Sequence, residues 1–168
     1  MIKYDEIKKI IKIIEECSAV ALTFYKQKHL EISIKDDNSP VTKADLEISR
    51  IATNKLSEMF PNDKIISEEN ITNLNEVDMT KYWLIDPIDG TKEFITKSGF
   101  FTINFALISN NKPVFGIICQ PTTSSIWFNI NNKAYKIKKT YNILDAKELK
   151  PKTINSVSYT HLTLPTNC

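Results

Sequence analysis

The sequence is poor in several residue types that mark particular protein classes. Three glycines in 168 residues are too few for a collagen-like chain or for glycine-rich linkers. Cys17, Cys119 and Cys168 are odd in number and contain no Cys-x-x-Cys pair, so they provide no disulfide framework. No apolar run has the length of a membrane span, and the first residues carry charges where a signal peptide is apolar. We therefore expect a cytoplasmic protein without a transmembrane segment.

Arginine is nearly absent as well. Arg50 is the one arginine among 22 basic residues, and the net charge is only +2. Arginine is the residue that most often contacts guanine or phosphate through two parallel hydrogen bonds. The sequence therefore disfavours nucleic acid as a partner, and a phosphate group would have to be held by other means. The lysine-rich stretch 133–152 is interpreted as a solvated face rather than a nucleic-acid patch.

The remaining composition is that of one globular domain. Hydrophobic residues make up 42% of the chain and charged residues 25%, which excludes wholesale disorder. Apolar residues recur at steps of three and four in two segments, and this spacing predicts two long amphipathic helices. The first helix would bury Ile7, Ile10, Ile11, Ile14, Cys17, Ala21 and Phe24. The second would run from near Thr42 to near Met59 and bury Ile48, Ile51, Ala52, Leu56 and Met59.

Short apolar or alternating segments predict the strands. Residues 64–67 and 82–85 are short strand candidates, and residues 101–108, 114–119, 125–130 and 134–137 predict a meander. Pairs of asparagines at 110–111 and 131–132 are expected to turn the chain. Residues 31–40 and 70–80 are polar and are expected to be loops. Two long helices packed on an antiparallel sheet predict a layered α+β fold.

Carboxylates gather after the strand predicted at 82–85. Asp86 follows this strand directly, Pro87 is expected to fix a turn, and Asp89 comes three residues later on the same side. Two carboxylates with the Ile88 carbonyl exposed between them offer the hard oxygen ligands that Mg²⁺ prefers. The alternative is a plain turn without a ligand, because Asp-Pro-x-Asp-Gly is favourable turn chemistry.

The two residues that follow suit an anion. Gly90 allows the backbone to approach a ligand closely. If a short helix begins at Thr91, the N–H groups of Gly90 and Thr91 point at a bound anion, as helix N-termini do. This arrangement would supply the contact with phosphate that the missing arginines cannot.

Other acidic positions have simpler explanations of their own. Glu68 and Glu69 follow the strand predicted at 64–67, where Ser67 could cap a helix and acids in its first turn would complement the helix dipole. Asp45 stands three residues after Thr42, which is the spacing of a capping box. Each position could therefore be structural when it is considered alone.

Together, three segments resemble a known family. Residues 37–45, 66–69 and 83–94 resemble, in the same order, motifs of the Mg²⁺-dependent phosphatases of the inositol monophosphatase superfamily. Within it, the chain is most similar to the 3'(2'),5'-bisphosphate nucleotidases of the CysQ type. Residues 92–94 are Lys-Glu-Phe, whereas inositol monophosphatases usually have Thr-Asn-Phe there. The strands between 101 and 138 match as well, so the resemblance covers residues 1–154.

This resemblance implies a fold and a metal site. The fold would be the layered, inositol monophosphatase-like fold, of which the chain matches the N-terminal domain. Glu68, Asp86 and the Ile88 carbonyl would hold a first Mg²⁺. Asp86 and Asp89 would share in holding a second. Family members complete that second site with an Asp from a Trp-Asp motif in a C-terminal domain, and Asp145 comes too early and lacks the Trp.

The resemblance also implies catalytic roles. Glu68 and Thr91 would orient the attacking water, and Asp45 would be hydrogen-bonded to Thr91. The N–H groups of Gly90 and Thr91 would bind the phosphate. The implied substrate-binding set is Glu68, Ile88, Asp89, Gly90 and Thr91. The reaction would be direct hydrolysis by a metal-activated water, which fits a chain without a Ser, Cys or Lys nucleophile motif.

The substrate implied by the resemblance is a small phosphate monoester. It would be 3'-phosphoadenosine 5'-phosphate, a by-product of sulfur assimilation. The enzyme would recycle it by hydrolysis to AMP and phosphate. One alternative is a phosphatase of inositol phosphate or another sugar phosphate. Another is a non-catalytic fragment that holds Mg²⁺ and phosphate.

The same comparison predicts how the chain is divided. Residues 1–155 would form the metal- and phosphate-binding domain. Residues 156–168 would be a tail that is either foreign to the domain or an ordinary frayed terminus. The C-terminal domain of the family would be absent, so slow or no turnover is expected of the chain alone.

Overall fold

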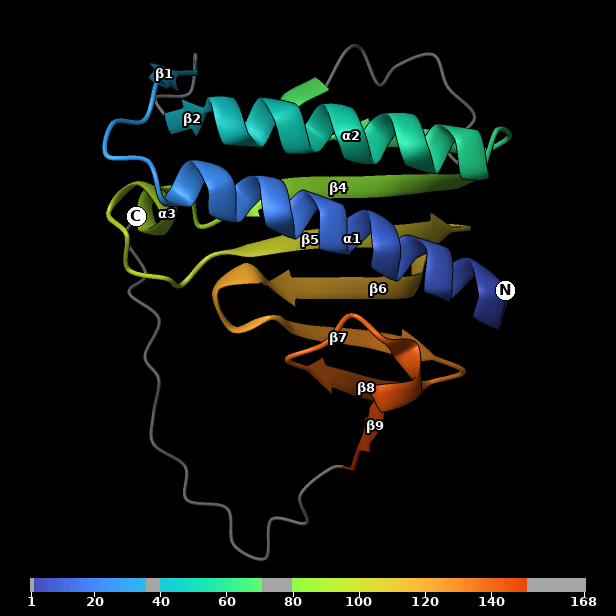
Figure 1. Ribbon diagram of the computed structural model, residues 1–168. Helices are drawn as coiled ribbons and strands as arrows, with labels where there is room; N and C mark the ends of the chain where they lie inside the picture. Colours follow the sequence, from blue (N-terminus) through green and yellow to red (C-terminus); the bar gives the residue numbers. More distant parts are fainter. Residues whose placement is uncertain (1, 36–39, 71–79, 151–168) are drawn as a thin grey trace, which may run out of the picture.

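The computed structural model describes residues 2–35, 40–70 and 80–150 (Figure 1). The helices are α1 (Tyr4–Tyr25), α2 (Lys43–Met59) and α3 (Thr91–Ile95). The strands are β1 (Ile32–Ile34), β2 (Pro40–Thr42), β3 (Lys64–Ser67), β4 (Lys81–Asp89), β5 (Thr102–Ser109), β6 (Lys112–Gln120), β7 (Ser125–Ile130), β8 (Lys133–Lys138) and β9 (Lys147–Leu149). Short 3₁₀ turns are η1 (Glu68–Asn70), η3 (Pro121–Thr123) and η4 (Ile143–Asp145).

The strands β3 to β9 form one sheet whose order in space follows their order in the chain. β3 pairs with β4 in parallel, and each later pair of neighbours is antiparallel. β1 and β2 form a separate antiparallel pair. The predicted layered α+β fold is confirmed. The sheet is mixed rather than wholly antiparallel, because β4 runs in the same direction as β3 after the connection 68–80, and parallel strands require such a connection.

The two long helices lie side by side across one face of the sheet (Figure 1). Isoleucine is the commonest residue of the core, and the largest fully buried side chains are aromatic: Trp83, Phe94, Phe101 and Phe105. A hydrogen bond of 2.6 Å between Ser18 Oγ and Tyr141 Oη joins α1 to the segment after β8. The predicted inner residues of both helices are buried, except Phe24 and Met59. These two are half-buried because they lie on the last turns of their helices.

Both asparagine pairs form the predicted turns. Asn110 and Asn111 connect β5 to β6, and Asn131 and Asn132 connect β7 to β8. All four residues have positive φ, between 49° and 63°. Two-residue hairpin turns require this left-handed backbone, and asparagine adopts it more readily than most residues with a side chain.

Some local predictions are wrong. Residues 31–40, expected to be a loop, contain β1 and the first residue of β2. The expected turn at Pro87 does not form, because β4 continues to Asp89. The short strand β9 extends the sheet beyond β8 and was not predicted. Residues 71–79 of the second predicted loop, and the predicted tail, lie outside the described residues.

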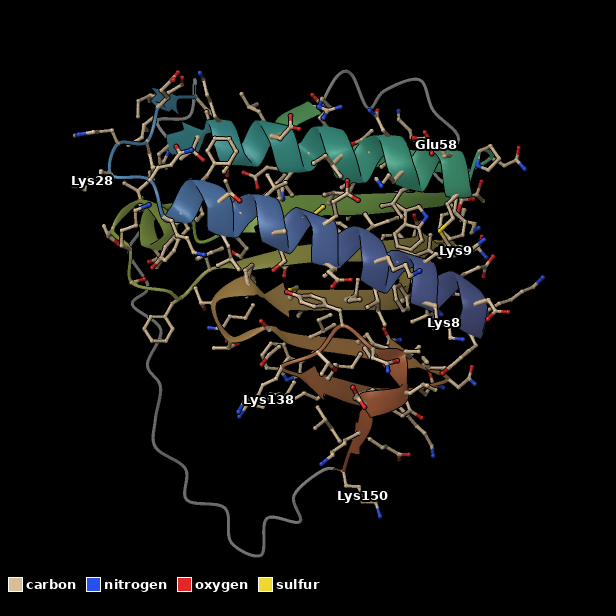
Figure 2. All side chains as sticks on the ribbon, in the orientation of Figure 1. Lys8, Lys9, Lys28, Glu58, Lys138 and Lys150 are labelled. Carbon is tan, nitrogen blue, oxygen red and sulfur yellow. The ribbon has the colours of Figure 1, made fainter. Side chains whose placement is uncertain are left out.

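The outer surface near β8 and β9 is rich in exposed lysines. Lys138 and Lys150 project away from the ribbon in Figure 2. Lys133 forms an ion pair of 3.0 Å with Glu148 on the neighbouring strand. These positions agree with a solvated face. In the described part of the chain, no helix combines the length and the apolar character needed to cross a bilayer.

Candidate active site

β4 carries the predicted acidic pair and is irregular at that point. Asp86 lies opposite Asn104 on β5, and Asp89 lies opposite Thr102, so three steps on β4 match two steps on β5. Side chains alternate along a strand, and the extra residue of this bulge therefore brings both carboxylates to the same face. The two aspartates share one side as expected, although a bulge rather than a turn places them there.

Asp45 on α2 divides its two carboxylate oxygens between two tasks. Oδ2 accepts hydrogen bonds from the Thr42 backbone N–H at 2.8 Å and from Thr42 Oγ1 at 2.5 Å, which completes the capping box of α2. Oδ1 accepts a long hydrogen bond of 3.5 Å from Thr91 Oγ1. Burial raises the pKa of Asp45, while the hydrogen bonds from Thr42 oppose the rise. The capping explanation and the contact with Thr91 are therefore both present.

Thr91 is the first residue of the short helix α3. Gly90, just before it, has a φ of 89°, in the left-handed region that favours glycine. A Cβ atom at Gly90 would lie 3.0 Å from the carbonyl oxygen of Phe100. Thr91 Oγ1 also lies 3.1 Å from the Ile88 carbonyl oxygen. One hydroxyl thus stands between the Asp45 carboxylate and the Ile88 carbonyl, and its single proton can go to only one of them at a time.

Glu68 and Glu69 begin η1 directly after β3, so they do lie in a first helical turn. They also share a cation: Lys35 Nζ donates to Glu69 Oε1 at 2.7 Å and to Glu68 Oε1 at 3.0 Å. The Glu69 side chain is 6% exposed and the Glu68 side chain is 49% exposed. Burial raises the pKa of Glu69, against the opposing effect of Lys35. Sequence reasoning missed Lys35, because it lies 33 positions from Glu68 and only the fold brings the two together.

Asp86 is a half-buried carboxyl group among other negative charges. Burial, followed by the charges of Glu68 and Asp89, raises its pKa from 3.8 to about 7. Its Oδ1 atom is buried and has no hydrogen-bond partner in the described part of the chain. An ionised carboxylate in these surroundings is unfavourable unless a cation compensates for it.

Asp89 is exposed but is held by β5. Its Oδ2 atom accepts hydrogen bonds from Asn104 Nδ2 at 3.0 Å and from Thr102 Oγ1 at 3.4 Å. Sequence reasoning missed both donors, because a polar residue on a strand gives no sign of its partner. The bulge sets the register of β4 on β5, and that register decides which residues of β5 meet Asp89.

A hollow of about 530 Å³ lies on the sheet next to Asp86. Asp86 and Asn104 line it together with apolar side chains, among them Leu84 and Ile118. Leu84 is 40% exposed and Ile118 is 45% exposed. The residues on either side of them along β4 and β6 point to the opposite face and are buried in the core. Asp86 therefore lies on the less covered face of the sheet.

The donor set fits a hard cation, although it is not gathered around one point. Within residues 2–35, 40–70 and 80–150, no three His, Cys, Asp or Glu side chains converge in an arrangement that could hold a metal ion. Glu68 contacts Lys35, and Asp89 contacts Asn104. The available donors are all oxygens, the Asp86 Oδ1 atom has no described partner, and a cation, the Lys35 ammonium, already neutralises part of the negative charge. The ligand roles of Glu68, Asp86, Ile88 and Asp89 remain predictions.

Comparison with known proteins identifies the family. The model of the inositol monophosphatase family matches residues 3–166. The chain belongs to the inositol monophosphatase family. This family member is 42% identical over 107 residues to the 3'(2'),5'-bisphosphate nucleotidase CysQ of Haemophilus influenzae, a match that covers 62% of this chain and 39% of that protein. It is 34% identical over 134 residues to CysQ of Escherichia coli K12, covering 77% of this chain and 54% of that protein.

A solved structure agrees with these relatives. The crystal structure of CysQ from Bacteroides thetaiotaomicron, a bacterial member of the inositol monophosphatase family, superposes with a TM-score of 0.73 at 27% identity. The superposition covers 92% of this chain and 63% of that one. The predicted resemblance to the family and to its CysQ-type members is confirmed. The chain spans about half the length of the curated relatives it matches, from 39% to 59%.

Proposed function

We propose that this inositol monophosphatase family member is a Mg²⁺-dependent phosphatase that removes the 3'-phosphate of 3'-phosphoadenosine 5'-phosphate. The products are AMP and inorganic phosphate. The observation that carries the proposal is the position of the Thr91 hydroxyl between Asp45 and the Ile88 carbonyl. Ile88 lies on β4, the bulged strand that also carries Asp86. The name of the CysQ relatives, 3'(2'),5'-bisphosphate nucleotidase, supports the choice of substrate.

Thr91 and Glu68 orient the attacking water in this reaction. The Thr91 hydroxyl donates its proton to Ile88 or Asp45, so its lone pairs remain available to accept a hydrogen bond from water. Asp45 keeps the hydroxyl in place because the capping box fixes the Asp45 carboxylate. The half-exposed Glu68 carboxylate accepts a hydrogen bond from the other O–H group of the water. The water oxygen forms a bond to phosphorus as the bond to the 3'-oxygen breaks. One proton of the water ends on the departing 3'-oxygen, which gives AMP, and the other stays with the inorganic phosphate.

The proposed Mg²⁺ ligands are Glu68, Asp86 and the Ile88 carbonyl, with Asp86 and Asp89 sharing in a second site. When bound, Mg²⁺ lowers the pKa of water and stabilises negative charge on the attacking and leaving oxygens. The raised pKa of Asp86 supports this assignment, because it reports negative charge that no described cation neutralises at that carboxyl group. Lys35 neutralises Glu68 and Glu69 when no metal is bound.

The phosphate is held by backbone N–H groups rather than by arginine. α3 begins at Thr91, and the first N–H groups of a helix have no acceptor within the helix. Gly90 lets the ligand approach because it carries no side chain. Arg50, the one arginine, lies on α2 in an ion pair with Glu47. We assign phosphate binding to Gly90 and Thr91 through their N–H groups. The proposed substrate-binding set also includes Glu68, Ile88 and Asp89.

The proposal includes a division of the chain and a location. Residues 1–155 would be the metal- and phosphate-binding domain, acting in the cytoplasm, and residues 156–168 a tail. The relatives are about twice as long as the part that matches, and their whole activity is therefore proposed for this chain by analogy.

Phosphate release tests the proposal. Purified chain is given 3'-phosphoadenosine 5'-phosphate or inositol monophosphate, with Mg²⁺ or with a chelator. Release that needs Mg²⁺ and favours the nucleotide supports the proposal, and Glu68→Gln should abolish it. Glu58→Gln is the matched control, because Glu58 is an exposed carboxylate of α2 that projects away from the protein (Figure 2).

The other outcomes identify the alternatives. A preference for inositol monophosphate would indicate a sugar phosphatase. Binding of Mg²⁺ without turnover of either substrate would indicate a non-catalytic domain.

A further inference from the structure

Asn104 on β5 contacts one proposed metal ligand and lies opposite another. Its Nδ2 atom donates to Asp89 Oδ2 at 3.0 Å. In the register of β4 and β5 its position is directly opposite Asp86. Asn104 thus contacts one of the two aspartates that the β4 bulge brings to one face and lies across from the other.

The orientation of this amide follows from its chemistry. An ionised carboxylate only accepts hydrogen bonds, so the NH₂ group of Asn104 must face Asp89 and its oxygen must face the other way. That oxygen, Oδ1, is buried and has no partner in the described part of the chain. A polar residue that served only the stability of the sheet would be expected to satisfy both ends of its amide. An unsatisfied acceptor on the residue opposite Asp86 points to a role in the site.

Both donors to Asp89 use the same carboxylate oxygen. Asn104 and Thr102 contact Oδ2, at 3.0 Å and 3.4 Å. Oδ1 takes part in neither hydrogen bond, and the two bonds restrict rotation of the carboxylate although Asp89 is exposed. Partners of this kind orient carboxylates for metal binding and typically affect affinity by about 10–100-fold.

We infer that Asn104 is a positioning residue. It holds Asp89 on the side of Asp86 and thereby sets the Mg²⁺ affinity of the site that Asp86 and Asp89 share. The inference rests on the proposed function, because it takes Asp86 and Asp89 to be metal ligands. Asn104 acts through Asp89 and needs no contact with the substrate.

The test measures Mg²⁺ binding without turnover. The melting temperature of the purified chain is followed as Mg²⁺ is added, and displacement of bound Mn²⁺, detected by electron paramagnetic resonance, gives the affinity independently. Asn104→Leu removes the donor at similar size, on the side where Leu84 and Ile118 are half exposed. It should raise the Mg²⁺ concentration at half-response about tenfold or more. Thr102→Val removes the longer hydrogen bond and should have a smaller effect in the same direction.

Asn129→Leu is the matched control. Asn129 lies in the same sheet and hydrogen-bonds the Gly116 N–H at 2.6 Å and the Val114 carbonyl at 3.3 Å, with no part in holding Asp89. It should lower the melting temperature without metal and leave the Mg²⁺ half-response unchanged. If Asn104→Leu does not fold, Asn104→Ser, which is too short to keep the contact, takes its place.

The outcomes separate this inference from the proposed function. If the unmodified chain responds to Mg²⁺ and Asp86→Asn abolishes the response, a half-response unchanged by Asn104→Leu overturns the inference alone. A folded, unmodified chain that binds neither Mg²⁺ nor Mn²⁺ overturns the proposed function and the inference with it. A shift in Asn104→Leu that is absent in Asn129→Leu supports the inference.

Discussion

Replacing Asp86 by Asn should stabilise the metal-free protein, even though Asp86 is proposed to be a ligand. In the folded state its pKa is about 7, against 3.8 for the isolated group, because of burial and the charges of Glu68 and Asp89. Between these pH values the folded chain keeps the Asp86 proton and the unfolded chain releases it. Stability therefore falls as the pH rises from about 4 to about 7, and stays lower above that range.

The size of the effect follows from the pKa difference. About three units correspond to roughly 4 kcal/mol at most. Because Asp86 is only half-buried, screening by water reduces this, and we expect about 2 kcal/mol. Asn has nearly the same shape and no charge, so Asp86→Asn removes the penalty. The melting temperature should rise by roughly 4–8 °C above pH 7 and change little near pH 4.

Denaturant unfolding in the presence of a chelator, at both ends of this pH range, measures the difference directly. Asp5→Asn is the control, because Asp5 is exposed on the first turn of α1 and should change stability by less than about 0.5 kcal/mol. Added Mg²⁺ should stabilise the unmodified chain and leave Asp86→Asn nearly unchanged. Equal stability of Asp86→Asn and the unmodified chain at high pH would refute the reasoning, because the carboxylates would then not repel one another.

Other variants test neighbouring parts of the site. Thr91→Ala should keep the fold and the Mg²⁺ response but lower phosphate release on the order of a hundredfold, and unchanged release would show that another group orients the water. Gly90→Ala should destabilise the protein by about 1–3 kcal/mol in denaturant unfolding, because its φ is 89° and a Cβ would lie 3.0 Å from a carbonyl oxygen. Lys35→Met should lower metal-free stability by about 1–3 kcal/mol, since Glu69 loses its cation, and Mg²⁺ should restore part of the loss. The purified chain should self-associate in light scattering and turn over slowly, and Ile118→Lys, on the less covered sheet face, should reduce the association; a fast, monomeric enzyme would contradict this expectation.

The sequence predicts those elements whose signals are local. The capping box at Thr42 and Asp45 lies within four residues, and it places the start of α2 correctly. The asparagine pairs carry their own backbone preference, so the hairpins are placed correctly as well. β1 and β9 are missed because each is a short strand that forms only by pairing with a neighbour.

The candidate site shows the same limit. The acidic residues could be singled out from their motifs, whereas their partners could not. Lys35 meets Glu68 across 33 positions, and Asn104 meets Asp89 across 15. The β4 bulge illustrates this further, because Asp-Pro-x-Asp-Gly is compatible with a turn and pairing with β5 keeps the segment extended. Tertiary contacts therefore decide geometry that local propensity leaves open.

The order of the strands has a consequence for how the protein folds. From β4 to β9 each strand pairs with the next one in the chain, and such local hairpins close early during folding. The connection between β3 and β4 (residues 68–80) is about as long as the one between β4 and β5 (residues 90–101), whereas α1 reaches a partner 123 positions away and depends on closure of a much longer loop. Among the described strands β3 is an edge strand, paired only with β4, and Glu68 follows it directly. In hydrogen exchange, the amides of β3 should lose protection before those of β5 and β6, and the site would come apart at Glu68 first.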